Sequence, residues 1–416
     1  MGLDEAGLRR SPRTRMPLVR SVGMVSLALG VLAIGAAPEQ SNLVAPAVAQ
    51  AQDAPKLPTA PASGVMGFIV TQFVPPVIQG KDACPDGPAL KTREITLSKV
   101  PAEDRERLAK AENQAEFRKL WIADVTGPNG TNMCSQYSQF PDRPTQRTVQ
   151  SKFAWGLNLD GDDGDGSKDP GGCAHQNFEA PTGEKGIDNQ AYRAMGCNLE
   201  WRGVDGSGGD LVAGYKQFFQ SGEWAQVLLL RGVDSLVNDP DVEVIFANTA
   251  DRPVLDSAGK FVWNASFTVS DKFPRVRNVL HGKIVNGVLT TEPTLIRLSQ
   301  VWGQGGARDL RGVRSWWTLN RGRMRLTFKP DGTLEGIVGG YQPLHEFVDS
   351  TSMGGMGSLL VAGIDCAGQW NTLKKLADGD RDPKTGQCTT ISAAHDLKAV
   401  PAFVNDLPIK KKIASK

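Results

Sequence analysis

The densest run of possible metal ligands lies at residues 158–169, which read Asn-Leu-Asp-Gly-Asp-Asp-Gly-Asp-Gly-Ser-Lys-Asp. Oxygen ligands at alternate positions, with Gly between them, are typical of Ca²⁺-binding loops. Carboxylates this close together repel one another unless water or a cation neutralises them. We therefore predict Ca²⁺ bound in this segment, with a solvated acidic turn as the alternative. The predicted ligands are Asp160, Asp162, Asp163, Asp165 and Asp169.

The spacing of this segment excludes an EF-hand. An EF-hand loop needs Gly at its sixth position and an acidic residue at its twelfth. Counted from Asn158, the sixth residue is Asp163, and counted from Asp163 neither required position is met. A looser Ca²⁺ loop remains the prediction.

The residues that follow the acidic segment offer a second set of donors. A metal site could combine His175, Glu179 and Asp188, and Asp188 and Asn189 could also serve the acidic loop as distant oxygen ligands. The alternative, which we favour, is a loop whose polar side chains cap backbone groups around a disulfide.

A second alternating acidic triplet consists of Asp378, Asp380 and Asp382. Arg381 and Lys384 lie beside it and could neutralise its charge without a metal. We therefore expect a solvated turn here.

No catalytic motif identifies an enzyme. The chain has four histidines, and it lacks a Gly-x-Ser-x-Gly elbow, a His-Glu-x-x-His pair and a phosphate-binding loop. His345-Glu346 is the best remaining acid–base pair, although such a pair is more often structural. Two carboxylates far apart in sequence could still form a hydrolytic site, so a secreted hydrolase remains the alternative function.

Trp263, Trp302, Trp316 and Trp317 lie in or near a region predicted to be rich in strands. Neighbouring residues of a strand point to opposite faces, so one of Trp316 and Trp317 should be partly exposed. An exposed indole can stack on a sugar ring, which weakly favours a carbohydrate or surface polymer as the ligand.

The cysteine count is even, and all six follow the amino-terminal segment discussed below. They are Cys84, Cys134, Cys173, Cys197, Cys366 and Cys388. An even number in an exported chain predicts three disulfides, for which 15 connectivities exist. Proximity in sequence favours Cys84 with Cys134, Cys173 with Cys197, and Cys366 with Cys388. A Cys-x-x-Cys metal or redox site is absent.

The amino-terminal 49 residues read as a signal peptide. Arg9 to Arg20 supply positive charge, Ser21 to Ala37 are uncharged and largely apolar, and Ala47-Val48-Ala49 matches the small-x-small cleavage pattern. Translation starting at Met16 would give the same outcome. A retained anchor is the alternative, but the apolar run is at the short limit for a membrane span. We predict export to the periplasm or the extracellular space, with no membrane span in the mature protein.

Charge argues against nucleic acid as a partner. Cleavage after Ala49 removes five basic and three acidic residues, so 47 basic residues become 42 and 45 acidic residues become 42. Phosphate contacts supply much of the affinity of nucleic-acid binders, which usually carry a basic excess. The mature chain has none.

The order of predicted elements gives an α+β fold, predominantly an antiparallel β sandwich or barrel with flanking helices and a long Gly/Asp-rich loop region. Strands are predicted at 65–79, broken by Pro75-Pro76, and repeatedly between 224 and 341, with Asn286-Gly287 and Asp331-Gly332 as turns. Helices are predicted from Pro101 to about Trp121, at about 209–220 and at 359–376, with a further short element at 391–403. The predicted organisation is a signal peptide (1–49), a disordered leader (50–64), an α+β region with the acidic disulfide-bonded loop (65–210), a β-rich domain (211–345) and a helical C-terminal region (346–416).

Two stretches resemble the core of uncharacterised exported proteins of proteobacteria. The first runs from Leu157-Asn-Leu-Asp-Gly through Cys173-Ala-His-Gln-Asn-Phe and Gly186-Ile-Asp-Asn-Gln to Gly196-Cys197, and the second from Ala377 to Phe403. This resemblance implies export and no particular activity. The sequence therefore predicts an exported, disulfide-stabilised protein that binds a ligand or surface component, with Ca²⁺ organising one loop.

Overall fold

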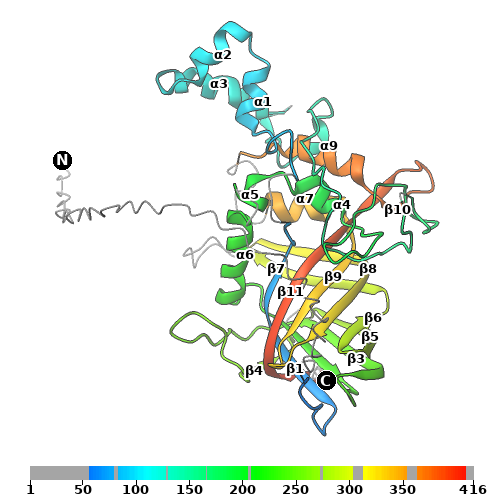
Figure 1. The fold of residues 1–416 in the computed structure, drawn as a ribbon. Helices are drawn as coiled ribbons and strands as arrows, with labels where there is room; N and C mark the ends of the chain where they lie inside the picture. The colour runs from blue at the N-terminus through cyan, green and yellow to red at the C-terminus, as the bar shows by residue number, and fades with distance from the viewer. Residues whose placement is uncertain are drawn as a thin grey trace, which may run out of the picture. The chain divides into compact units, whose positions relative to one another are not determined.

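The structure is a computed structural model that describes residues 56–78, 83–127, 130–164, 166–204, 208–271, 275–302, 313–353 and 363–408 (Figure 1). The predicted signal peptide at 1–49 lies outside these residues. Within the predicted disordered leader, residues 56–64 form no helix or strand, but Leu57 and Ala60 pack against the hydrophobic core. This part of the leader is therefore held in place by burial of its apolar side chains.

Eight strands of the described chain close into an antiparallel barrel, as the α+β prediction of a sandwich or barrel allows. Their order around the barrel is β1-β2-β3-β5-β6-β8-β9-β11, and β11 pairs back with β1 (Figure 1). Closure leaves no free edge among these eight strands. Their bounds are β1 Val65–Val74, β2 Gln226–Arg231, β3 Asn238–Asn248, β5 Arg277–Val285, β6 Val288–Thr291, β8 Val313–Phe328, β9 Leu334–Pro343 and β11 Cys388–Asn405.

Three further strands extend the barrel. They are β4 Ser266–Thr268, β7 Thr294–Trp302 and β10 Gly379–Arg381. β4 runs parallel to the end of β11, and β10 pairs with its start. β7 pairs with the first part of β8, whose second part pairs with β6. β8 is thus one long strand that pairs with two neighbours, whereas the residue pattern predicts two separate strands, at 315–319 and 324–328.

Two asparagine side chains bind β7 to the body of the barrel. The amide of Asn278 donates to the carbonyl of Arg297 at 2.9 Å and accepts from its N–H at 2.8 Å. Asn248 makes the same pair of contacts with Ser299, at 2.9 Å each. These primary amides satisfy backbone groups on the edge of β7 that pairs with no strand in the described part of the chain.

The barrel interior is the main hydrophobic core. Residues of one strand face alternate sides, so Ile391, Ala393, Leu397 and Ala399 of β11 enter the core while Asp396 faces outward. Burial of large side chains stabilises this core by roughly 1.5–3 kcal/mol each. The largest fully buried ones include Trp224, Tyr215, Phe68, Phe73, Phe219 and Phe246.

The predicted turn between β5 and β6 is confirmed. Asn286 and Gly287 have φ of 51° and 79°, the left-handed pair that a two-residue hairpin of type I′ requires. β1 ends at Val74, directly before the predicted break at Pro75-Pro76.

Helices cover one end and one side of the barrel. α4, α7 and α9 lie together beyond one end in Figure 1, and α6 packs beside β1. The predicted helix at 209–220 is confirmed as α6, which places Tyr215 and Phe219 against Trp224. The bounds in this group are α4 Gln190–Met195, α5 Leu199–Arg202, α6 Asp210–Ser221, α7 Leu344–Met353 and α9 Cys366–Leu376, with a 3₁₀ turn, η3, at Tyr137–Gln139.

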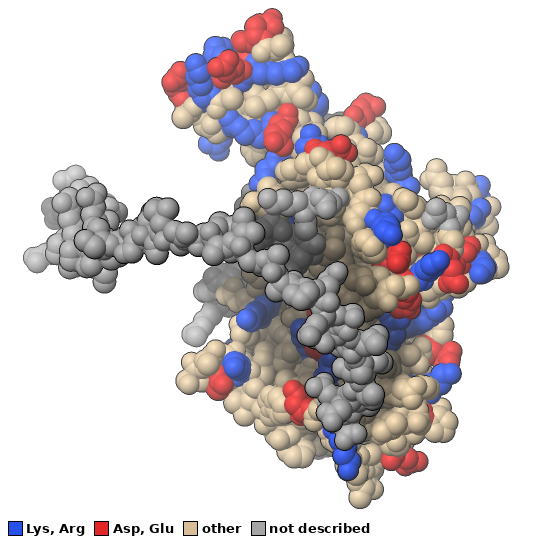
Figure 2. All heavy atoms as spheres, viewed as in Figure 1, with Lys and Arg blue, Asp and Glu red and all other residues tan. Residues whose placement is uncertain are grey.

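A second helical group consists of α1 Thr92–Ser98, α2 Ala102–Ala109, the 3₁₀ turn η1 Ala111–Asn113 and α3 Gln114–Val125. The single helix predicted from Pro101 to Trp121 is therefore broken at Lys110, whose backbone is extended. Figure 2 shows acidic and basic side chains intermixed over this group. Arg107, which pairs with Asp104 and Glu116, is one example.

The prediction of a helical C-terminal region is wrong beyond residue 388. β11 is an 18-residue strand there, and the predicted helix at 359–376 begins, within the described residues, at Cys366. β11 pairs with β1 and β9, which lie far from it in sequence. The local sequence of β11 does not by itself indicate a strand. Its pairing with these distant strands decides its conformation.

The structure contains three disulfides, as predicted, but the favoured pairing is wrong in every case. Cys84 pairs with Cys197, Cys134 with Cys366, and Cys173 with Cys388, with sequence separations of 113, 232 and 215 residues. Barrel closure brings the two ends of the chain together, so distance along the sequence is a poor guide to distance in space. Two of the three disulfides, Cys134–Cys366 and Cys173–Cys388, link the amino-terminal half of the chain to the carboxyl-terminal half, and Cys84–Cys197 lies within the amino-terminal half.

Among the described helices, none is long and apolar enough to cross a membrane.

Candidate metal centre

The acidic segment lies on the outer face of β8, β9 and β11. Leu157 and Leu159 point into a small apolar cluster with Ile337, Tyr341 and Ala394. Arg323 of β8 donates to the carbonyls of Asn158 and Leu159 at 3.2 and 2.8 Å. The segment is therefore anchored to the barrel by both apolar and polar contacts.

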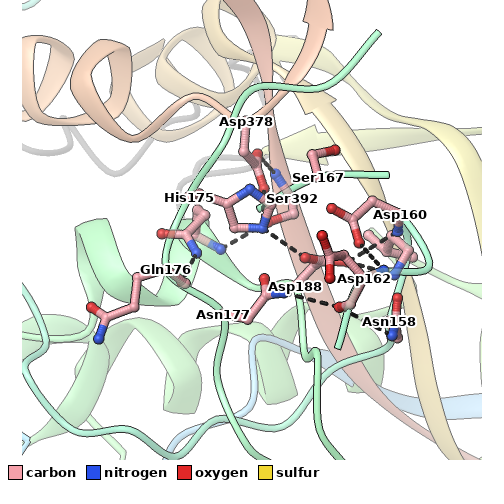
Figure 3. Close-up of polar contacts among 12 residues, drawn as sticks. Asn158, Asp160, Asp162, Ser167, His175, Gln176, Asn177, Asp188, Asp378 and Ser392 are labelled. Atoms are coloured by element: carbon pink, nitrogen blue, oxygen red, sulfur yellow. Dashed lines mark hydrogen bonds and ion pairs between the residues drawn. The ribbon is translucent and has the colours of Figure 1, made fainter. Parts of the chain in front are cut away.

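Three potential ligands converge where this segment meets the next loop. One ligand atom from each of Asp160, His175 and Asp188 lies within 4.8 Å of the others (Figure 3). The side chain of Asp188 is fully buried and that of His175 is 7% exposed. The sequence indicated Asp160 as a loop ligand, His175 with Asp188 in a second set, and Asp188 also as a distant ligand of the acidic loop. The fold brings these three residues together.

His175 is held by both of its ring nitrogens. Nδ1 lies 2.9 Å from the carbonyl oxygen of Cys173, and Nε2 lies 2.8 Å from Oδ1 of Asp188. A carbonyl can only accept, so Nδ1 donates and the ring orientation is set by the backbone. Nε2 therefore faces the carboxylates, with Oδ2 of Asp378 at 3.7 Å.

Asp188 also positions the backbone that carries Asp160. Its Oδ2 accepts from the N–H of Leu159 at 2.5 Å and of Asp160 at 3.2 Å. Gly186, with φ of 71°, lets the chain before Asp188 lie directly against the backbone of Asp162, where a Cβ would collide. The two loops are thus fitted to one another.

Asp378 is a third acidic group at this centre and its fourth potential ligand. It is fully buried, and its Oδ1 accepts from the N–H of Ser392 at 2.7 Å. Its Oδ2 has no hydrogen-bond partner among the described residues. The next residue, Gly379, lets the backbone beside Asp378 lie close to Tyr341, because a Cβ at position 379 would overlap the ring of Tyr341.

Burial and mutual charge shift the pKa values of these groups. Burial raises the pKa of Asp378 to about 7, although the charge of His175 opposes the shift. Burial, and then the charge of Asp188, raise the pKa of Asp160. Burial disfavours protonated His175, but the hydrogen bond to Asp188 and the charge of Asp378 outweigh it and raise its pKa to about 9. At neutral pH the imidazolium therefore supplies the positive charge that the carboxylates need.

Tyr341 and Arg321 border the centre. Burial, and then the charges of Asp188 and Asp378, raise the pKa of Tyr341, whose buried hydroxyl has no hydrogen-bond partner among the described residues. The Arg321 guanidinium lies 4.2 Å from the centre of the Tyr341 ring and pairs with Asp169 and Asp380. The outer part of the acidic loop is thus neutralised by a barrel residue.

The other predicted Ca²⁺ ligands do not join this group in the described part of the chain. Asp162 accepts from the N–H of Gly164 at 3.0 Å, and Asp163 accepts from the side chain of Asn158 at 2.9 Å. Asp169 accepts from the N–H of Gly171 and pairs with Arg321. Asp165 lies outside the described residues. Ca²⁺ in this loop stays a prediction.

Most of the remaining candidates have structural partners. Glu179 pairs with Lys152 at 3.5 Å, and Asn189 caps α4 by accepting from Tyr192 N–H at 3.1 Å. His345 contacts the hydroxyl of Tyr137 at 2.9 Å. In the second acidic triplet, Asp380 pairs with Arg321 and Asp382 caps its own turn.

The sequence missed two residues of the centre. Asp378 was noted in the second triplet, but nothing local indicated that it would be buried beside His175. Tyr341 carried no signal at all, because only its register with Ser392 in the sheet brings it there.

The tryptophan predictions have mixed outcomes. Trp317 is 4% exposed in the core, whereas its neighbour Trp316 is only partly buried, which confirms the expected difference. Trp263 is 44% exposed. The Trp302 side chain lies outside the described residues.

No protein-family model, curated protein or solved structure matches this chain.

Proposed function

We propose that this protein binds a divalent metal ion through Asp160, His175 and Asp188, with Asp378 as a further oxygen donor. The observation that carries this proposal is the convergence of three ligand atoms within 4.8 Å, from two loops that hydrogen bonds of Asp188 hold against one another. The buried Oδ2 of Asp378, which has no hydrogen-bond partner among the described residues, adds a donor that a cation would satisfy. A bound ion would fasten the acidic loop to the outer wall of the barrel.

The orientation of His175 supports this function. Histidines that bind metals usually donate their second ring N–H to a backbone carbonyl or carboxylate, and His175 Nδ1 does so to Cys173. Loss of the Nε2 proton would then free a nitrogen ligand that already faces the carboxylates. One imidazole nitrogen with carboxylate oxygens suits Zn²⁺ or Mn²⁺ better than Ca²⁺, which takes six to eight oxygens.

Hydrolysis fits the same residues less well. A general base has to present a lone pair to the substrate, but both ring nitrogens of His175 face acceptors. We therefore prefer metal binding to the secreted-hydrolase alternative.

We also propose that the protein acts outside the cytoplasm, in the periplasm or extracellular space, where it binds a ligand or surface component. Three disulfides persist in oxidising compartments, and the amino-terminal 49 residues have the pattern of a signal peptide.

The test is metal analysis of the purified mature protein, followed by thermal melting with and without EDTA and after addition of Zn²⁺, Mn²⁺ or Ca²⁺. We expect one equivalent of a first-row metal and a melting temperature that falls by several degrees when it is removed, because only the native state holds these ligands together. His175→Gln and Asp378→Asn should abolish the metal-dependent shift.

Asp163→Asn is the matched control, since this residue lies in the same loop outside the cluster. It should keep the full shift. If Ca²⁺ alone stabilises the protein and Asp163→Asn removes the effect, the ion binds in the outer loop and the proposed centre is wrong. A metal-free protein whose melting no ion changes would also overturn it.

A further inference from the structure

Two adjoining hollows lie on the outer face of β1 and β11, away from the metal centre. Their volumes are about 550 and 460 Å³, and both are lined by Gln72 and Lys216. Because they share these residues, the two hollows adjoin one another, and together they are called the groove. Binding sites for small molecules usually measure about 300–1,000 Å³, so the combined space suits an extended ligand.

The register of the two strands gives the groove a polar floor. Asp396 and Lys398 of β11 point outward, opposite to the core residues His395 and Leu397. β1 carries a bulge between Val70 and Gln72, which turns Gln72 onto the same outer face. Gln72 donates a hydrogen bond to Asp396, so a planar amide and a carboxylate lie side by side.

The walls of the groove are held in place. α6 forms one wall and supplies Lys216 and Gln220, and the loop at 258–263 forms the other. Gln220 Nε2 donates to the carbonyl of Gly259 at 2.9 Å, which joins the two walls. Asp256 closes the loop by accepting from the N–H groups of Ala258 and Lys260 at 2.8 Å each.

An aromatic edge completes the site. Trp263 lines the groove and is 44% exposed, while Phe261 packs against the core beneath it. Asn264 follows with φ of 58°, and its N–H donates to the carbonyl of Pro401 at 2.7 Å. The backbone beside Trp263 is thus tied to β11, and the indole is presented without the cost of ordering a free loop.

The charges of the lining residues favour an anionic ligand. Lys216, Lys260 and Lys398 line the groove, and Asp396 is the one acidic residue among its described lining residues. Lys398 also lies 3.9 Å from Glu335, which lies outside the groove. A tryptophan face, planar amides and cations together match a ring that has an apolar face, many hydroxyls and a carboxylate.

We propose that this groove binds a segment of an acidic polysaccharide, of the uronic-acid class. Trp263 stacks on a sugar ring, Gln72 and Asp396 bind its hydroxyls, and Lys216 and Lys260 pair with its carboxylates. The proposal is independent of the metal centre.

The test is isothermal titration of the full mature protein with an oligogalacturonate of six units. A neutral hexasaccharide of glucose and a polyglutamate of similar charge serve as comparison ligands. We expect the acidic sugar to bind at least tenfold more tightly than either, with affinity that falls as salt is added. Titrations before and after EDTA treatment separate this site from the metal centre.

Trp263→Ala and Lys216→Gln should each weaken binding of the acidic sugar several-fold or more. Trp263→Tyr should lose less affinity, because tyrosine keeps an aromatic face for stacking. Lys283→Gln, at an exposed lysine of β5 that lines neither hollow, is the matched control and should bind normally. Equal binding of polyglutamate would identify a mere polyanion surface. That result would overturn the proposal. So would equal binding of the neutral sugar, or an affinity for the acidic sugar that neither groove variant changes.

Discussion

Nε2 of His175 lies 2.8 Å from Oδ1 of Asp188, although the two residues belong to separate loops on the outside of a closed barrel. The loop of His175 is fixed by Cys173, whose carbonyl accepts from the same ring and whose sulfur is bonded to Cys388 of β11. Cys173 N–H also donates to the carbonyl of Asp378 at 2.9 Å. The Cys173–Cys388 disulfide therefore fixes the residue that contacts two of the proposed ligands, His175 and Asp378.

Replacing both Cys173 and Cys388 by Ser should weaken metal binding as well as stability. Loss of a native disulfide costs about 2–5 kcal/mol of unfolding free energy, here with the added loss of the His175 anchor. Urea unfolding measures the first effect, and the Zn²⁺- or Mn²⁺-dependent shift in melting temperature measures the second. The control replaces Cys84 and Cys197, which close a different loop, and it should lose stability but keep the metal shift. Equal metal responses in the two variants would contradict this role of Cys173.

Asn278→Ala should destabilise the barrel at the β5–β7 junction. The change removes a donor and an acceptor for the Arg297 backbone at a side chain that is 9% exposed. An unsatisfied buried polar group costs about 1–3 kcal/mol, so we expect a loss of about 2–4 kcal/mol in urea unfolding. Asn405→Ala, at an exposed asparagine that ends β11, should change stability by less than about 0.5 kcal/mol. A similarly small loss of stability in Asn278→Ala would contradict this role, because it would show that water can satisfy the Arg297 backbone groups in place of the amide.

His395→Phe should make stability less sensitive to acid. His395 is buried between Phe73 and Trp317, and burial lowers its pKa to about 3. Between pH 6.5 and 3 the unfolded chain binds a proton that the folded chain does not, so the free energy of unfolding falls as pH falls.

The slope is up to about 1.4 kcal/mol per pH unit, and the wild type should therefore lose about 2 kcal/mol more than His395→Phe between pH 7 and 5. Urea titrations at the two pH values measure this difference. His281→Gln, at an exposed histidine of β5, should behave as the wild type does. Parallel losses in the wild type and His395→Phe would mean that another group dominates the acid response.

Several local features could be read from the sequence because neighbouring residues alone decide them. The hairpin at Asn286-Gly287 depends on two left-handed residues, and the break after Val74 depends on two prolines without N–H groups. The apolar periodicity of 210–221 likewise specifies one helix face. Asp160, His175 and Asp188 were identified as possible donors from residue type and spacing.

The tertiary contacts of these residues could not be predicted from the sequence, because closure of the barrel decides which segments meet. Cys173 bonds to Cys388 and not to Cys197 because β11, which begins at Cys388, lies in the sheet beneath the acidic loop. Asp378 and Tyr341 reach the proposed metal centre through the same packing.

By itself, the sequence determined the kinds of element, the presence of disulfides and a supply of metal donors. Each of these depends on residue chemistry and on short-range backbone geometry. Only the tertiary structure decided which cysteines pair, which carboxylates gather around His175 and where Gln72, Lys216 and Trp263 form a groove. Those choices depend on contacts between strands that are up to hundreds of residues apart, and no local pattern encodes that pairing.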